Sequence, residues 1–321
     1  MPYRNNPHTP DHSASAGASS SSSSNSPAQQ HTGAMPVVSP PPAITPELRD
    51  WIIAQAQANI PAPTLLQAMC DAGWNEDVAL DAMDITLREH LASTAQQQGL
   101  PRANALPQPD LQRSPACIDV DDRRVDVLVS MALPRLVVFG NLLSGEECDA
   151  LVHAAAPRLA RSLTVATATG GEEVNADRTS AGMFFARSEN PLLQRIEERI
   201  ARLLDWPLDH GEGLQVLHYP PGAEYKPHYD YFDPAEPGTP TLLRRGGQRL
   251  ATLILYLNTP KQGGGTVFPD AYMEVAAQRG NAVFFSYDRP HPDTRSLHGG
   301  APVLAGEKWI ATKWLREREF R

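Results

Sequence analysis

The stretch HGGAPVLAGEKWIATKW, residues 298–314, carries the strongest signal for the fold of this 321-residue chain. Its second half predicts a strand, on which alternate side chains share a face. That face holds Lys308, Ile310, Thr312 and Trp314. A buried lysine is costly unless it meets an anion, so Lys308 is expected to receive a carboxylate in an apolar pocket. Lys313 lies on the opposite face and is expected to be solvated.

Three His-x-acid patterns offer candidate metal ligands, and only one has a favourable context. They are His210-Gly211-Glu212, His228-Tyr229-Asp230 and His291-Pro292-Asp293. Two histidines and one carboxylate on one side of the metal are the ligand set of non-haem Fe(II) oxygenases. Glycines flanking Glu212 favour a turn, and Pro292 disfavours a ladder strand. His228 and Asp230 lie in an aromatic-rich stretch that can form a strand and present both side chains on one face. His298 is the expected third ligand.

Short apolar runs separated by Gly and Pro dominate the chain after residue 209. These runs are 214–219, 225–231, 250–257, 282–287 and 308–315, and residues 134–139 form another. Many short strands with turn signals between them predict a sandwich or barrel. Two helices, one opening at the capping box of residues 144–147 and one at Asn190-Pro191, are expected outside it. The predicted class for residues 117–321 is mainly β with flanking helices.

The first third of the chain divides by composition into three parts. Residues 1–43 contain a serine tract and few large apolar side chains, which predicts disorder. Residues 44–94 have apolar side chains at three-to-four spacing and predict a small helical unit. Residues 95–116, rich in Gln and Pro, predict a flexible linker. Residues 65–83, with the pair Gly73-Trp74, resemble the ubiquitin-associated family; a generic helical appendage that recruits a protein partner is the alternative.

Charge and cysteine content limit the possible partners and compartments. The formal net charge of −9 argues against nucleic acid and anionic membranes as partners. Cys70, Cys117 and Cys148 are few and far apart, which predicts neither a disulfide framework nor a cysteine zinc site and favours a reducing cytoplasm. No stretch approaches the roughly 20 apolar residues of a membrane helix. We expect a cytoplasmic protein that acts on peptides or small molecules.

Residues 130–316 resemble the prolyl 4-hydroxylase family of 2-oxoglutarate-dependent oxygenases. The similarity runs from PRLVVF at 134–139, through RTSAGMF at 178–184 and GGGTVFP at 263–269, to the strand ending at Trp314. It implies a double-stranded β-helix, or jelly roll, and Fe(II) bound by His228, Asp230 and His298. It also implies that Lys308 binds the far carboxylate of 2-oxoglutarate. Tyr219, Thr266 and Trp314 would complete that pocket.

The resemblance further implies what the chain acts on. Tyr225, Arg249 and Trp314 correspond to substrate contacts. Residues 233–247 look like an insertion and are expected to form a mobile lid. The implied reaction is hydroxylation of peptidyl proline, with oxidative decarboxylation of 2-oxoglutarate to succinate and CO2, using O2 and, as in the family, ascorbate. Two alternatives stay open: the same chemistry on a free amino acid or small metabolite, and a catalytically silent binding module.

Overall fold

The computed structural model describes residues 44–321 except 162–163, 166–171 and 174–178. The predicted disorder of residues 1–43, and Arg178 of the family motif, lie outside the described residues. The helices are α1 (Pro46–Gln57), α2 (Ala62–Asp71), α3 (Glu76–Gln97), α4 (Gly145–Ala155), α5 (Pro191–Leu203) and α6 (Thr239–Leu243). None of the described helices is both long enough and apolar enough to cross a membrane.

The strands follow the helical unit and fill most of the remaining chain. They are β1 (Cys117–Val120), β2 (Arg123–Met131), β3 (Arg135–Gly140), β4 (Ala160–Arg161), β5 (Thr164–Val165), β6 (Glu172–Glu173), β7 (Ala181–Phe184), β8 (Gln215–Tyr219), β9 (Tyr225–His228), β10 (Arg249–Tyr256), β11 (Gln262–Gly263), β12 (Thr266–Phe268), β13 (Met273–Val275), β14 (Ala282–Ser286), β15 (His298–Gly300), β16 (Val303–Ala305) and β17 (Lys308–Arg316). The predicted strands at 134–139, 214–219, 250–257, 282–287 and 308–315 are confirmed within two residues. The strand predicted at 225–231 ends early, at His228.

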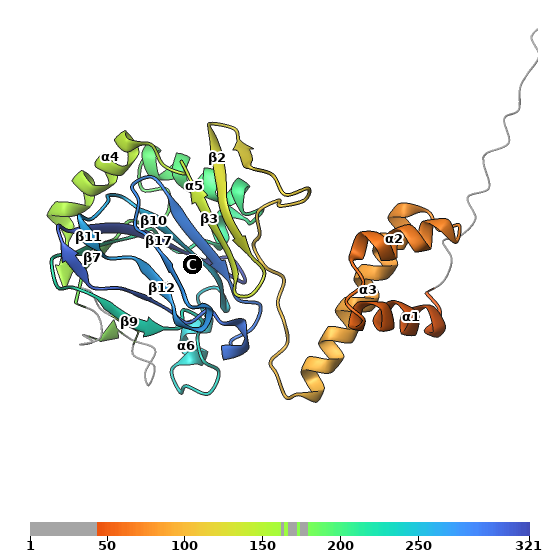
Figure 1. The fold of residues 1–321 in the computed structure, drawn as a ribbon. Helices are drawn as coiled ribbons and strands as arrows, with labels where there is room; N and C mark the ends of the chain where they lie inside the picture. Colours follow the sequence, from red (N-terminus) through yellow and green to blue (C-terminus); the bar gives the residue numbers. More distant parts are fainter. Residues whose placement is uncertain (1–43, 162–163, 166–171, 174–178) are drawn as a thin grey trace, which may run out of the picture.

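Two antiparallel sheets form the predicted jelly roll. The larger has the order β1-β2-β3-β14-β10-β17-β8-β7-β4 and the smaller β13-β12-β15-β9. The two sheets face each other (Figure 1). Their shared core contains Ile254 and Phe285 from the larger sheet and Phe268 and Val275 from the smaller one. Alternation along β10 therefore directs Ile254 inward, and Leu253 points to the opposite side.

The outer face of the larger sheet is covered by α4 and α5, as predicted. Leu151 of α4 and Ile196 of α5 share a core with Leu253 and Phe284. Both helix starts are as expected from sequence: α4 has a complete capping box, and the Asn190 side chain accepts from the N–H of Leu193 before Pro191. These helices fix the sheet from behind and leave its inner face to the site.

The helical unit has its own small core, and the segment that follows it is held on the catalytic domain. Helices α1 to α3 pack around Ile52, Leu65, Met69, Ala79, Ala82 and Met83. Helix α3 continues to Gln97, three residues past the predicted end of the unit. Beyond it, the Asn104 N–H donates to the Asp288 carbonyl at 2.7 Å and the Gln108 N–H to the Leu204 carbonyl at 2.9 Å. Residues 104–108 are therefore anchored, contrary to the flexible linker that their composition suggested.

This anchoring predicts that the linker, but not the helices, contributes to the stability of the catalytic domain. Pro107 and Pro109 are buried, and Leu111 packs against the core behind the larger sheet. A chain that begins at residue 98 should melt like the full chain. A chain that begins at Cys117 should lose about 2 to 4 kcal/mol of unfolding free energy, and its Tm should fall by roughly 5 to 15 °C. Equal Tm values in calorimetry would show that the anchoring contributes nothing.

Candidate active site

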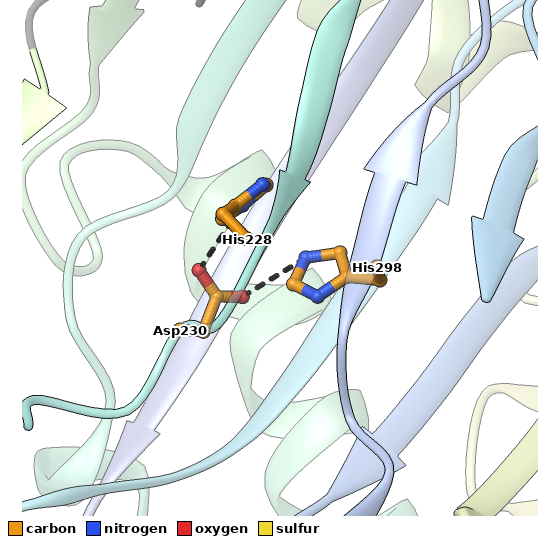
Figure 2. A group of neighbouring side chains, drawn as sticks. All are labelled: His228, Asp230 and His298. Carbon is orange, nitrogen blue, oxygen red and sulfur yellow. Dashed lines mark ion pairs between the residues drawn. The ribbon is translucent and has the colours of Figure 1, made fainter. Parts of the chain in front are cut away.

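Three side chains from two neighbouring strands meet inside the jelly roll. His228 ends β9 and is paired with His298 of β15 in antiparallel register, so the two imidazoles lie close together. Asp230 lies in the bend after β9, beyond the strand that its spacing predicted, and points back between them (Figure 2). Its Oδ1 is 3.7 Å from His228 Nε2, and its Oδ2 is 3.4 Å from His298 Nε2. One ligand atom from each residue lies within 4.8 Å of the other two, as a three-ligand metal site requires.

Backbone carbonyls orient both imidazoles toward this centre. His228 Nδ1 lies 2.9 Å from the Lys226 carbonyl oxygen, and His298 Nδ1 lies 3.0 Å from that of Ser296. A carbonyl can only accept, so the Nδ1 atom carries the proton and Nε2 keeps its lone pair. Fixing the tautomer in this way is the usual support for a metal-binding histidine. The two rings are thus prepared to bind a cation through Nε2.

The Asp230 carboxylate is held in its charged form by its surroundings. The Thr252 hydroxyl donates to Oδ2 at 2.7 Å and lies 3.0 Å from the Tyr287 hydroxyl. Burial alone would raise the pKa of Asp230, but His298, His228 and Arg249 outweigh it and, with the Thr252 hydrogen bond, lower the pKa well below its usual range. The group is therefore an ionised, pre-oriented metal ligand at neutral pH.

A buried ion network lies next to the centre. Glu212 accepts from Arg249 at 2.7 and 3.0 Å and from Arg316 at 2.8 Å. The Arg249 guanidinium lies 4.0 Å from the Trp314 ring and 4.0 Å from Asp230 Oδ1. Its substrate role stays a prediction; the structure shows it packed between Glu212, Trp314 and the metal ligand.

Lys313 corrects one expectation from the sequence. It is buried, not solvated, and its ammonium group donates to the Glu197 carboxylate of α5 and to the Glu212 carbonyl. Strand periodicity placed Lys313 on the opposite face from Lys308 correctly. It could not show that α5 covers that face with a carboxylate.

A pocket opens beside the metal ligands and contains most of the predicted site residues. The predicted site residues in its lining are Tyr219, Tyr225, His228, Asp230, Thr266, His298, Lys308 and Trp314. The four alternate residues of β17, from Lys308 through Ile310 and Thr312 to Trp314, all line the pocket, as predicted. Arg249 is not part of this lining. The predicted iron and cosubstrate residues are therefore brought together around one space, with Leu217, Ile254 and Ile310 as its apolar wall.

Lys308 is a buried cation whose side chain has no hydrogen bond or salt bridge within the part of the chain that the structure describes. It is 2% exposed, and its ammonium lies 5.4 Å from the centre of the Tyr219 ring. Burial lowers the pKa of Lys308 to about 8, while Glu274 acts in the opposite direction. Lys313, equally buried on the same strand, has its carboxylate. The arrangement of Lys308 fits an anionic ligand that supplies the missing partner.

Two neighbouring groups add donors to the same pocket. The Tyr256 hydroxyl donates to Thr266 Oγ1 at 2.8 Å, which leaves the Thr266 proton available for a ligand oxygen. The Trp314 indole N–H is buried without a hydrogen-bond partner among the described residues. A buried donor left unpaired is costly, so both positions favour a polar ligand in this space.

The other two His-x-acid patterns lie outside this centre, as the sequence indicated. His210 ends a short 3-10 helix with Nε2 3.8 Å from Asp209. His291 lies at the N-terminal end of a second short 3-10 helix, where its Nδ1 accepts from the Asp293 N–H. Glu212 is the buried partner of two arginines. The stretch 233–247, expected as a mobile lid, contains α6, and Arg316 donates to the carbonyls of Leu242 and Gly247 within it.

Sequence reasoning missed the groups that support the ligands. Thr252 and Tyr287, which hold Asp230, were not predicted. A signal was present for Thr252: it is the polar residue among apolar neighbours on β10 and shares the inward face with Ile254 by the two-residue period. Tyr287 follows β14 directly and gave no comparable signal.

Sequence comparison with known proteins agrees with this site. A model of the 2OG-Fe(II) oxygenase superfamily matches residues 214–316. Probable prolyl 4-hydroxylase 3 of Arabidopsis thaliana is 41% identical over 209 residues, 59% of this chain and 71% of that protein. Prolyl 4-hydroxylase 1 of the same plant is 42% identical over 203 residues, 58% of this chain and 70% of that protein. Among solved structures, the 2OG complex of the viral collagen prolyl hydroxylase from Paramecium Bursaria Chlorella virus-1 aligns at 30% identity with a TM-score of 0.44, covering 56% of this chain and 95% of that one.

The geometry predicts a graded loss of metal affinity. Replacing His228, Asp230 or His298 by alanine should weaken binding more than about 100-fold, because a ligand atom is lost outright. Thr252→Val keeps the ligands but removes the hydrogen bond to Asp230, so it should cost about 10- to 100-fold. Titration with Co(II), followed by its visible absorption, measures both effects.

His291→Ala is the matched control, since His291 belongs to a pattern of the same type outside the centre. It should bind Co(II) like the unaltered protein. If His291→Ala lost the metal while His228→Ala kept it, the ligand assignment would be wrong.

Proposed function

Because the chain belongs to the prolyl 4-hydroxylase family of Fe(II)- and 2-oxoglutarate-dependent dioxygenases, we propose that it hydroxylates proline residues in a peptide or protein. The observation that carries this proposal is the three-ligand centre beside a buried lysine that lacks an anion. A catalytically silent module would have no need for the hydrogen bonds that orient the two imidazoles and the carboxylate.

The residues present fit both groups that the family requires. Fe(II) would be held by His228 Nε2, His298 Nε2 and the Asp230 carboxylate, and three protein ligands leave positions for further oxygen ligands. The far carboxylate of 2-oxoglutarate would meet Lys308 and the Thr266 hydroxyl. When bound, the iron supplies the oxidative decarboxylation of 2-oxoglutarate to succinate and CO2 that is coupled to hydroxylation with O2. The requirement for ascorbate stays a prediction.

The chain itself supplies position and exclusion of water. The apolar side chains of Leu217, Ile254 and Ile310 line one side of the space for the cosubstrate. Tyr225 stacks on the His228 ring with centroids 3.7 Å apart, and Trp314 lies against Arg249. These contacts restrict where a substrate carbon can approach the centre, which is the main contribution of a protein to such chemistry.

Proline as the substrate is supported by the relatives and by the shape of the pocket rim. The curated relatives reported above are named prolyl 4-hydroxylases. In this chain Tyr225 and Trp314 line the pocket, and Phe184 extends the aromatic surface outward, 47% exposed and 6.3 Å from the Trp314 ring. Flat aromatic surfaces suit a proline ring, and an extended polyproline II backbone has little entropy left to lose on binding.

Lys308→Met tests the cosubstrate assignment through two opposite effects. The KM for 2-oxoglutarate should rise about tenfold to over a hundredfold, since a charge-assisted bond contributes roughly 1.5 to 3 kcal/mol. The free protein should become more stable near pH 7 by on the order of 1 to 3 kcal/mol, because the charged lysine no longer has to be buried.

The stability gain should depend on pH with a definite sign. The pKa of Lys308 is lowered from 10.5 to about 8, so the cost of burying its charge is fully present below pH 8 and disappears as pH rises toward 10.5. Denaturant unfolding at several pH values measures this. An unchanged KM would place the 2-oxoglutarate carboxylate elsewhere.

The substrate proposal is tested with proline-rich peptides and their Pro→Ala counterparts. With Fe(II) and 2-oxoglutarate, mass spectrometry should detect one added oxygen only in peptides that contain proline, with succinate formed in step. Equal oxidation of the alanine peptides, or turnover only with a free amino acid, would disprove the prolyl assignment and leave the iron chemistry intact.

A further inference from the structure

Helix α3 of the helical unit exposes a row of leucines to solvent. Leu80 is 45% and Leu91 64% exposed, and Leu87 between them is only partly buried. Spacings of seven and four residues place all three on one side of the helix. The buried side, with Ala79, Ala82 and Met83, is a different one. Single exposed leucines are ordinary, but a row on one helix face marks an interaction surface.

The leucine row lies in a strongly acidic environment. Residues 44–97 contain eight acidic and two basic side chains, a formal charge of −6 within the −9 of the whole chain. Asp81 and Asp84 follow Leu80 by one and four residues, and both are exposed. Asp84 accepts from Arg88 one turn further on, and its carboxylate remains about half exposed. Nucleic acid and anionic membrane would be repelled, and so would a second copy of the same face. The charge therefore selects a basic partner.

The anchored linker keeps this face near the active site. Helix α3 ends at Gln97, and the Asn104 N–H is bound to the Asp288 carbonyl. Seven residues span at most about 25 Å. Asp288 follows Tyr287, whose hydroxyl contacts Thr252 beside the metal ligand Asp230. Along α3 the face lies about 9 to 25 Å before Gln97. A protein bound there is thus tethered within about 50 Å of the Asp288 anchor, which raises the local concentration of its other segments at the catalytic domain.

We propose that the α3 face, defined by Leu80, Asp81, Asp84, Leu87 and Leu91, binds a Lys- or Arg-rich segment with apolar side chains in the protein that carries the acceptor proline. This inference rests on the proposed function. The leucines bury apolar side chains of that segment, the aspartates attract its cations, and the tether presents its prolines to the pocket.

Two labelled peptides test the proposal with the full-length protein. Both begin with the same decaproline acceptor; one continues with repeats of Lys-Leu-Leu-Lys, the other with repeats of Glu-Leu-Leu-Glu. Fluorescence anisotropy, which needs neither iron nor 2-oxoglutarate, should show the lysine peptide binding at least about tenfold more tightly. The difference should shrink with added salt. Equal affinity of the two peptides would overturn the proposal.

Variants locate the binding on α3. Leu80→Ser/Leu91→Ser and, independently, Asp81→Asn/Asp84→Asn should each weaken the lysine peptide about fivefold or more. Two control variants, Leu128→Ser/Leu304→Ser and Asp119→Asn/Asp149→Asn, alter exposed side chains of the catalytic domain. Both should bind the lysine peptide like the unaltered protein. The charge variant keeps the test valid if the serine variant unfolds. Test variants that bind like these controls would place the partner elsewhere.

Turnover separates this inference from the proposed function. The decaproline peptide without a tail should be hydroxylated equally by the α3 variants and the unaltered protein, and only the lysine-tailed peptide should lose its KM advantage. No hydroxylation of any peptide, with anisotropy as expected, would contradict the prolyl assignment alone. A dimer of the full chain that Leu80→Ser/Leu91→Ser dissociates would mean that a second copy covers the face, and would overturn the inference.

Discussion

Three buried cations on one strand determine how this active site is organised. Strand β17 carries Lys308, Lys313 and Arg316, and each of these side chains is only 2% exposed. A buried charge needs a partner, and the fold gives partners to two of them: Glu197 for Lys313 and Glu212 for Arg316. Lys308 alone faces the pocket without a carboxylate among the described residues. The same physical requirement that fixes the far end of the strand thus reserves a place for an anionic ligand at its beginning.

The end of β17 that carries Arg316 is also connected to the metal centre through a chain of buried charges. Glu212 joins Arg316 to Arg249, and Arg249 lies against Trp314 and within 4.0 Å of an Asp230 oxygen. Because Glu197 belongs to α5, the helix behind the sheet is connected to the ligands in front of it through buried charges. Displacing Glu212 would leave both Arg249 and Arg316 without their buried carboxylate, which costs several kcal/mol. The network therefore restricts movement of the side of the pocket that Trp314 lines.

Sequence was sufficient where order and periodicity determine the answer. The order of His228, Asp230, His298 and Lys308 identified the centre, and the two-residue period put Lys308 and Trp314 in one pocket. Sequence failed where a distant element decides. Lys313 was expected in water because nothing local reveals Glu197, and Tyr287 became a support for Asp230 only through sheet pairing. The linker looked flexible because composition does not show that Asn104 and Gln108 find carbonyl partners in the catalytic domain.

The depth of the groups in the pocket implies an order of binding. Lys308 is 2% exposed, whereas Phe184 beside Trp314 is 47% exposed, so the cosubstrate end lies deeper than the aromatic rim. A peptide on the rim would obstruct the way to Lys308, and a dicarboxylate bound first would not obstruct the rim. A bound dicarboxylate also removes the cost of the unpaired lysine, so it stabilises the surface on which the peptide then docks. If the chain acts on a peptide as proposed, we expect 2-oxoglutarate to bind before it, for reasons of charge burial and access together.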